Sequence, residues 1–218
     1  IVNPINPLLE AEQIAGILRE TNAKVLVTLK PFPKSDVAHR AAKAVANAPN
    51  VKTVIEVDLN RYLTPPKSWI VPFVRPKNPV HHKAKVIAYG RETRAMPSDK
   101  LTFADSRGDR VAAYFHTGGT TGLPKVAQHK YSGMIYNGWL GATLLFKETD
   151  VLICPLPLFH VLAAYPVLMS CIASGAHLVL PTPAGYRGEG VFDNFWKLIE
   201  RWKVTFLITV PTAIAALM

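Results

Sequence analysis

The sequence predicts an α/β fold with mostly parallel sheet layers and helices on both faces. Short valine-rich runs alternate with helical patterns of about 10–15 residues, which is typical of parallel strands joined by crossover helices. Apolar residues make up 49% of the 218 residues and charged residues 18%. This composition supplies a substantial core and argues against wholesale disorder.

The first part of the chain reads as helix, strand, helix and strand. The first helix places Ile14, Ile17 and Leu18 on one face, and the second begins at a capping serine and ends at a proline. The four elements are expected at residues 8–22, 23–28, 35–49 and 51–57.

The alternation resumes at Arg110. Strands are expected at 110–117, 150–157, 176–182 and 204–212. Helices are expected at 132–146, 161–175 and 191–203. The last helix is amphipathic, with an apolar face formed by Phe192, Phe195, Trp196 and Ile199.

Charge divides the chain into an α/β segment at 1–60, a basic proline-containing linker or surface excursion at 61–109, and an α/β core at 110–218. From Arg61 to Arg94, eight Lys or Arg residues face one acid, Glu92. Charge runs are most often solvated surface, so we favour a solvated linker. The formal net charge of +10 leaves nucleic acid, a membrane surface or an anionic substrate open as partners. The pair His81 and His82 lacks further ligands at useful spacing, so we expect no zinc site there.

The stretch from Val151 to Tyr186 carries no Asp, Glu, Lys or Arg and is long enough for a membrane span. Several prolines and Gly175 interrupt it, so a strand, helix and strand in a buried core explain it better. Cys154 and Cys171 lie in apolar surroundings, and we expect two reduced, buried thiols in a cytoplasmic protein.

The most informative stretch is HTGGTTGLPK, residues 116–125, between a predicted strand and a predicted helix. Its glycines allow close backbone approach, and successive N–H groups can form a concave site for an anion. Hydroxyls and one lysine complete a set of donors suited to a polyphosphate. The candidate phosphate-binding residues are Thr117, Gly118, Gly119, Thr120, Thr121, Gly122 and Lys125. The common P-loop is excluded, because Pro124 precedes the lysine and Val126 follows it.

The run YFHTGGTTGLPKVAQHK resembles the phosphate-loop signature of the adenylate-forming (AMP-binding) superfamily, usually Y-T-S-G-T-T-G-x-P-K-G-V. The closest likeness is to acyl-CoA synthetases, and similar segments include NPLLEAEQIAGILRETNAKVLVT, CPLPLFHV and VTFLITVPT. The resemblance covers nearly the whole chain and implies part of the large N-terminal domain of such an enzyme. Gly118 stands where Ser is common, and Val126 and Ala127 replace Gly-Val, which could shift substrate affinity.

The resemblance implies a two-step ligase reaction with ATP and Mg²⁺. A carboxylic acid, expected to be a fatty acid, attacks the α-phosphate, and coenzyme A then displaces AMP. The loop would hold the β- and γ-phosphates, with Lys125 acting electrostatically and Thr121 near the magnesium ion together with a glutamate from elsewhere. His160 would border the acyl pocket, although a lone histidine in an apolar segment is as readily a core residue. Tyr186 is a further acyl-pocket candidate, although a plain loop at 182–190 is the simpler interpretation.

Elements that the family needs elsewhere do not occur in these residues: the Y-G-x-T-E motif, a ribose-binding Asp and the C-terminal lid with its lysine. The ending TAIAALM resembles a helix cut in mid-pattern, so we expect a fragment that is inactive alone. Two other interpretations stay open: a nucleotide- or phosphate-binding module without chemistry, and a basic protein that binds nucleic acid or a membrane surface. We favour the ligase, with no nucleic-acid partner, and peripheral membrane contact is compatible with it. The acid, its chain length and the oligomeric state are not specified.

Overall fold

A computed structural model describes residues 1–77, 80–104, 108–117 and 125–218. The chain forms two compact units. The N-terminal unit lies within Asn6–Ser106, and the C-terminal unit combines Ile1–Ile5, Arg107–Thr117 and Lys125–Met218. Both units are mixed α/β structures with parallel sheets and helices, which confirms the predicted fold class.

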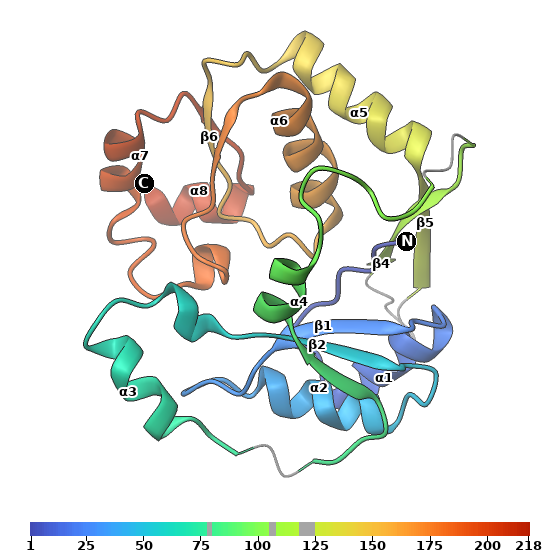
Figure 1. The fold of residues 1–218 in the computed structure, drawn as a ribbon. Coiled ribbons are helices and arrows are strands. Elements are labelled where there is room, and N and C mark those ends of the chain that lie inside the picture. Colours follow the sequence, from blue (N-terminus) through green and yellow to red (C-terminus); the bar gives the residue numbers. More distant parts are fainter. Residues whose placement is uncertain (78–79, 105–107, 118–124) are drawn as a thin grey trace. The chain divides into compact units, whose positions relative to one another are not determined.

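The N-terminal unit is a parallel three-stranded sheet in the order β1 (Val25–Leu29), β2 (Thr53–Val57) and β3 (Lys85–Ala88). Helices α1 (Ala11–Glu20) and α2 (Val37–Ala46) lie side by side against it (Figure 1). As predicted, Ile14, Ile17 and Leu18 are buried on one face of α1. The alanines of α2 let the two helices approach closely, so this unit has a compact helical layer.

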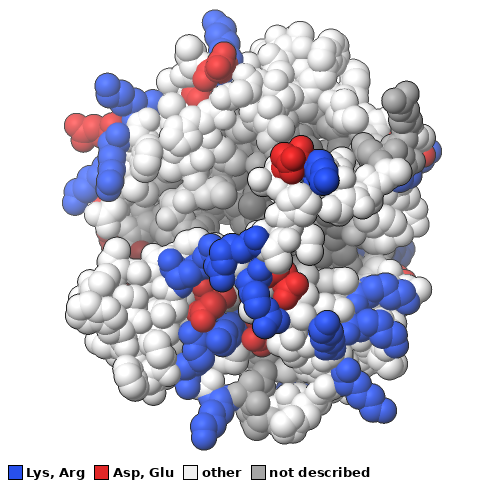
Figure 2. Space-filling model, in the orientation of Figure 1, with Lys and Arg blue, Asp and Glu red and all other residues white. Residues whose placement is uncertain are grey.

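The basic segment after β2 contains regular secondary structure that the sequence analysis did not predict. It contains η1 (Leu59–Tyr62), α3 (Lys67–Val74), β3 and α4 (Tyr89–Ala95). Strand β3 pairs in parallel with β2, with Lys85 opposite Thr53. Figure 2 shows the Lys and Arg side chains gathered over this part of the unit. Strand β3 is short and flanked by charged residues, so its sequence did not indicate a strand. Its backbone is held by β2, which is distant in sequence.

The C-terminal unit contains a parallel sheet in the order β7 (His177–Val179), β6 (Val151–Ile153) and β8 (Phe206–Leu207). These strands are shorter than predicted, and β6 and β7 each end two residues before a proline, which lacks the N–H donor that continues a strand. The helical elements of this unit are α5 (Tyr131–Leu144), η2 (Ala163–Val167), α6 (Leu168–Ser174), η3 (Gly185–Arg187), α7 (Phe195–Trp202) and α8 (Pro211–Leu217).

Residues 111–130 contain two paired strands, where the sequence predicted one strand, a loop and then a helix. Strand β4 (Val111–Thr117) pairs in antiparallel fashion with β5 (Lys125–Lys130), and α5 begins only after β5. The expectation that the glycine-rich loop leads directly into a helix is therefore wrong. A short strand such as KVAQHK gains its backbone hydrogen bonds from a partner strand, which local propensity does not report.

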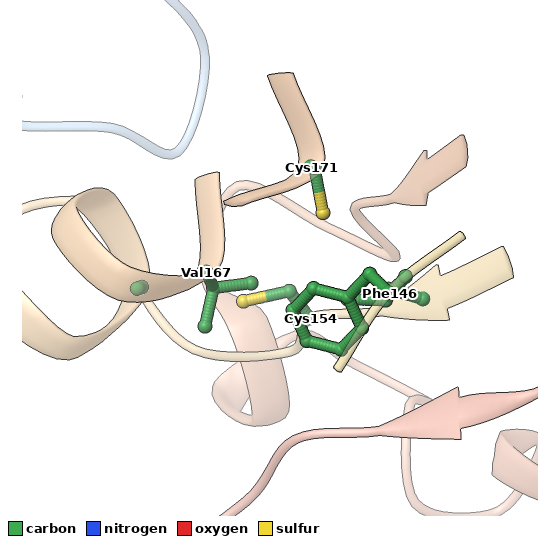
Figure 3. Packing of buried hydrophobic residues seen from close by; sticks show 6 residues of the cluster. Phe146, Cys154, Val167 and Cys171 are labelled. Carbon is green, nitrogen blue, oxygen red and sulfur yellow. The ribbon is translucent and has the colours of Figure 1, made fainter. Parts of the chain in front are cut away.

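The core of the C-terminal unit surrounds β6. Buried Phe146, Cys154, Val167 and Cys171 pack together, and both cysteine sulfurs point into this cluster (Figure 3). The cysteines are free and buried, as predicted. Burial raises the pKa of Cys171 to about 11, and it raises the pKa of Cys154 as well. Both side chains therefore stay protonated thiols near neutral pH and act as packing residues.

Helix α7 begins later than predicted. Phe195 is fully buried at its first position and Ile199 packs on the same cluster, whereas Phe192 precedes the helix and Trp196 is largely exposed. In the part of the chain that the structure describes, no helix combines the length and apolarity needed to cross a membrane.

Candidate functional site

The β4–β5 hairpin brings the two ends of the glycine-rich loop together. Thr117, the last residue of β4, stands opposite Lys125, the first residue of β5. The Lys125 side chain is exposed. The predicted loop residues Gly118, Gly119, Thr120, Thr121 and Gly122 lie outside the described residues, as does the side chain of Thr117. The structure therefore supplies the base of the proposed anion site: a lysine held across from the point where the loop departs.

The N-terminal residues of the chain reinforce β4 along its other edge. The N–H of Val2 donates to Ala112 O at 2.9 Å, and the N–H of Tyr114 donates to Val2 O at 2.9 Å. Beside them, Asn3 Oδ1 and His116 Nε2 form a hydrogen bond of 2.8 Å. His116 immediately precedes the loop base, so these bonds hold the start of the loop in place. Sequence analysis did not assign a role to Asn3.

A chain of aromatic rings connects the hairpin with the helical layer of the same unit. The ring centroids of Phe115 and His129 are 5.2 Å apart, and those of His129 and Tyr165 are 4.9 Å apart. The Tyr165 hydroxyl packs against Gly133 of α5. A Cβ added to Gly133 would lie only 2.8 Å from this hydroxyl. Burial raises the pKa of Tyr165, so it stays a neutral phenol. His129, in β5, is thus a packing residue.

The carboxyl edge of the β7–β6–β8 sheet carries both acyl-pocket candidates. His160 follows β6, and Tyr186 follows β7. In open parallel sheets, ligands bind beyond the carboxyl ends of the strands. His160 and Tyr186 are thus related by following neighbouring parallel strands at the same edge of the sheet.

Tyr186 is half-buried and makes both hydrogen bonds and ring contacts. Its N–H donates to Pro155 O at 3.0 Å, and its hydroxyl and that of Thr209 form a hydrogen bond of 2.6 Å. Its ring stacks on Phe192 with centroids 5.1 Å apart. Burial raises the pKa of this phenol. The preceding Gly185 has a φ of 58°, and a side chain there would collide with Pro155 O. The loop at 182–190 is therefore a packed turn, with Tyr186 anchored to the ends of β6 and β8.

His160 is exposed, which does not fit the interpretation as a core histidine. Its N–H donates to Pro157 O at 3.0 Å, and its carbonyl accepts from Ala164 N at 3.2 Å. The backbone is thus fixed at the start of the helical segment that includes η2. The ring lies against Phe159, with centroids 4.7 Å apart, and remains accessible.

Within the described residues, no cluster of three or more His, Cys, Asp or Glu side chains is arranged to hold a metal ion. The predicted magnesium contact, Thr121, lies outside them. Thr209 and Tyr165 were missed by sequence analysis. The signal for Thr209 was a hydroxyl near the end of a strand, but the strand was predicted to run past it.

These features define an α/β protein with Lys125 at the base of a hairpin loop and with His160 and Tyr186 beyond the carboxyl ends of β6 and β7. The family model of the AMP-binding enzymes matches residues 1–218. The chain therefore belongs to the AMP-binding enzyme family, which confirms the resemblance seen in its loop.

Known relatives agree with this assignment. The chain is 32% identical to a marinolic acid–CoA ligase of Pseudoalteromonas sp., covering 100% of this chain and 31% of that protein. It is 28% identical to 4-coumarate-CoA ligase 2 of Narcissus pseudonarcissus, covering 100% of this chain and 34% of that protein. The solved structure of an anthranilate CoA ligase with anthranoyl-AMP matches the fold with a TM-score of 0.71 at 21% identity, covering 99% of this chain and 36% of that one. The chain thus spans about a third of the length of these proteins.

Proposed function

We propose that this chain is the part of an acyl-CoA synthetase that binds the phosphates of ATP. In the proposed reaction, a carboxylate oxygen attacks the α-phosphate of ATP and displaces pyrophosphate. The thiol sulfur of coenzyme A then attacks the acyl carbon of the adenylate, forms the thioester and releases AMP. Magnesium would accompany ATP. The observation that carries the proposal is the hairpin that places Lys125 opposite Thr117, in a chain matched over its full length by the AMP-binding enzymes.

Lys125 acts electrostatically in this proposal. Pyrophosphate gains negative charge as it leaves, and strand pairing fixes the backbone of Lys125 at the loop base, from which its ammonium can reach that charge. The neighbouring threonine hydroxyls and backbone N–H groups of 117–122 would orient the β- and γ-phosphates in line with the attack. The bonds from Val2 and Asn3 to β4 support this role, because they hold the start of the loop in place.

Lys125→Ala tests the proposal in the full-length protein. We expect adenylation, followed by pyrophosphate exchange, to fall by about 10²–10³, the usual effect of removing a donor aimed at a transition-state charge. Lys130→Ala is the matched control, since Lys130 is an exposed lysine at the other end of β5. An exchange rate for Lys125→Ala within about threefold of the parent protein would contradict the proposal.

The acid is the finer part of the proposal. We propose a fatty acid, bound beside the carboxyl edge of the β7–β6–β8 sheet, with His160 and Tyr186 at its pocket. The support is that both residues leave this edge and that His160 is exposed. Tyr186 would act by shaping the pocket wall, because Thr209 already bonds its hydroxyl.

His160→Ala should change the preference among acids or lower kcat, with the KM for ATP little affected. His177→Ala is the control, because His177 is an exposed histidine at the amino end of β7, away from the carboxyl edge. Kinetics with a panel of fatty and aryl acids and paired melting curves give the answer. A lower melting temperature with unchanged acid preference would assign His160 a structural role instead.

A further inference from the structure

Helix α3 of the N-terminal unit exposes an apolar face. Trp69 is 67% exposed and Phe73 is 89% exposed, and their spacing of four residues puts them one turn apart on the same side. Ile70 and Val74 form a second exposed pair at the same spacing. Only Val71 is buried within this helix, so it anchors α3 to the unit. We call the four exposed residues the α3 patch.

Basic residues surround the α3 patch. Lys67 begins the helix and Lys77 follows it, and both are exposed. The sequence has no Asp or Glu from residue 59 to residue 91. The acids that flank this stretch already have partners: Asp58 accepts from Arg75 Nη2 at 2.9 Å, and Glu92 accepts from Arg91 Nε at 3.3 Å. Figure 2 shows an uncharged surface where Figure 1 draws α3, with Lys and Arg side chains beside it.

This combination selects among possible partners. Nucleic acid would match the positive charge of the lysines, but it would offer no apolar surface to Ile70 and Val74. A second copy of the chain would set lysine against lysine around the patch, and like charges repel. An anionic bilayer satisfies both features, because Trp and Phe settle at the boundary of headgroups and acyl chains while lysines reach the phosphates. With eight residues, α3 is too short to span a bilayer and would lie in its surface.

We propose that α3 docks the protein on an anionic phospholipid membrane, with Trp69 and Phe73 inserted at the headgroup boundary and Lys67 and Lys77 on lipid phosphates. The proposal is independent of the ligase reaction, since it rests on a surface of the N-terminal unit. It gives the basic segment a role that the phosphate loop does not explain.

The test is co-sedimentation of the full-length protein with vesicles of phosphatidylcholine, alone or with about one-third phosphatidylglycerol as the anionic lipid. Trp69→Ser combined with Phe73→Ser removes the apolar contact. The matched control is Tyr136→Ser with Trp139→Ser, two exposed aromatic residues on α5, a helix of the C-terminal unit. Lys67→Glu with Lys77→Glu reverses the charge, and Lys43→Glu with Lys197→Glu makes the same change in net charge elsewhere.

We expect tight binding to the anionic vesicles only, weakened by salt. The aromatic variant should bind at least about tenfold more weakly, since two interfacial side chains are lost. The lysine variant should lose at least about 25-fold, because one basic residue near an anionic surface contributes about fivefold. Both controls should stay within about twofold of the parent. All variants should keep the parent's circular dichroism, because the altered side chains are exposed.

Three results would overturn the proposal. The parent protein could fail to sediment with anionic vesicles or bind neutral ones equally well. The α5 control could lose as much binding as the α3 variant. The aromatic variant could instead change the molecular mass in solution or lower the melting temperature, which would show that a protein surface covers the α3 patch.

Discussion

At the scale of single residues, the closest helix approach in the C-terminal unit depends on Gly141. A methyl group there would overlap Oγ and Cβ of Ser170, which is 2% exposed on α6. About one helical turn earlier on the same face, a methyl on Gly138 would lie 2.9 Å from the backbone oxygen of Met169. Glycine is a poor helix former, so its place in the middle of α5 is explained by packing against α6.

Gly141→Ala should lower the free energy of unfolding by about 1–3 kcal/mol, because overpacking outweighs the gain in helix propensity. Urea unfolding measures this change. Gly90→Ala in α4 is the control: the nearest atom, Arg61 Nη1 at 3.0 Å, is the end of a flexible side chain and can move. Adding Ser170→Gly to Gly141→Ala should restore part of the loss. A stabilising Gly141→Ala would show that α5 and α6 can separate without penalty.

At the scale of elements, Asp58 links β2, η1 and the end of α3. It caps η1 by accepting from Asn60 N at 3.0 Å, and both of its carboxylate oxygens accept from Arg75 Nη2 at 2.9 Å. Burial by itself would raise the pKa of Asp58, but the bonds from Arg75 and Asn60 outweigh it, so the pKa lies below its ordinary value. This carboxylate therefore holds the basic segment to the end of β2.

The lowered pKa of Asp58 makes its contribution dependent on pH. The stabilisation is complete above the pKa of the unfolded chain, about 3.9, and is lost as the pH falls through the lower pKa of the folded state. Asp58→Asn should therefore lower the free energy of unfolding by about 1 kcal/mol at pH 7, a modest value because the pair is partly exposed. The difference from the parent should shrink toward pH 3, as followed by urea unfolding.

Glu56, two residues earlier on β2, provides a control of opposite sign. Burial raises its pKa, so its charged form is disfavoured in the folded protein at neutral pH. Glu56→Gln should stabilise the protein at pH 7, and this advantage should disappear as the pH falls through the raised pKa. Equal pH dependence in both variants would contradict the assigned roles of these two carboxylates.

At the scale of the whole molecule, the 218 residues provide two compact units and the strands that flank the glycine-rich loop, and they contain no Y-G-x-T-E motif. We expect this chain alone to release no AMP above background from ATP, Mg²⁺, coenzyme A and a panel of acids. Holding reactants in line contributes about 7–11 kcal/mol only when the whole site is assembled. The full-length protein is the positive control, and mass spectrometry excludes its presence in the sample. Turnover by the chain alone would show that its own residues complete the site.

The glycine-rich stretch could be singled out, and helices such as α1 and α2 could be predicted, because their signals are local. Glycines, hydroxyls and a lysine within HTGGTTGLPK predict an anion-binding stretch by their own chemistry, and the family match confirms the resemblance that this stretch carried. The spacing of Ile14, Ile17 and Leu18 likewise predicted their common buried face. Residue order alone carries both kinds of information, since each interaction lies within one turn or one loop.

Tertiary structure alone decided the features that depend on partners distant in the chain. Lys125 meets Thr117 because β5 pairs with β4, and Lys85 lies in a sheet because β2 offers it hydrogen bonds. The bond between Tyr186 and Thr209 joins two strand ends in the same way. Short strands and single hydroxyls have weak intrinsic preferences, so the pairing energy of a remote neighbour determines their structure. The residue types of the candidate site can therefore be read from the sequence, whereas their positions relative to one another depend on the pairing of distant strands.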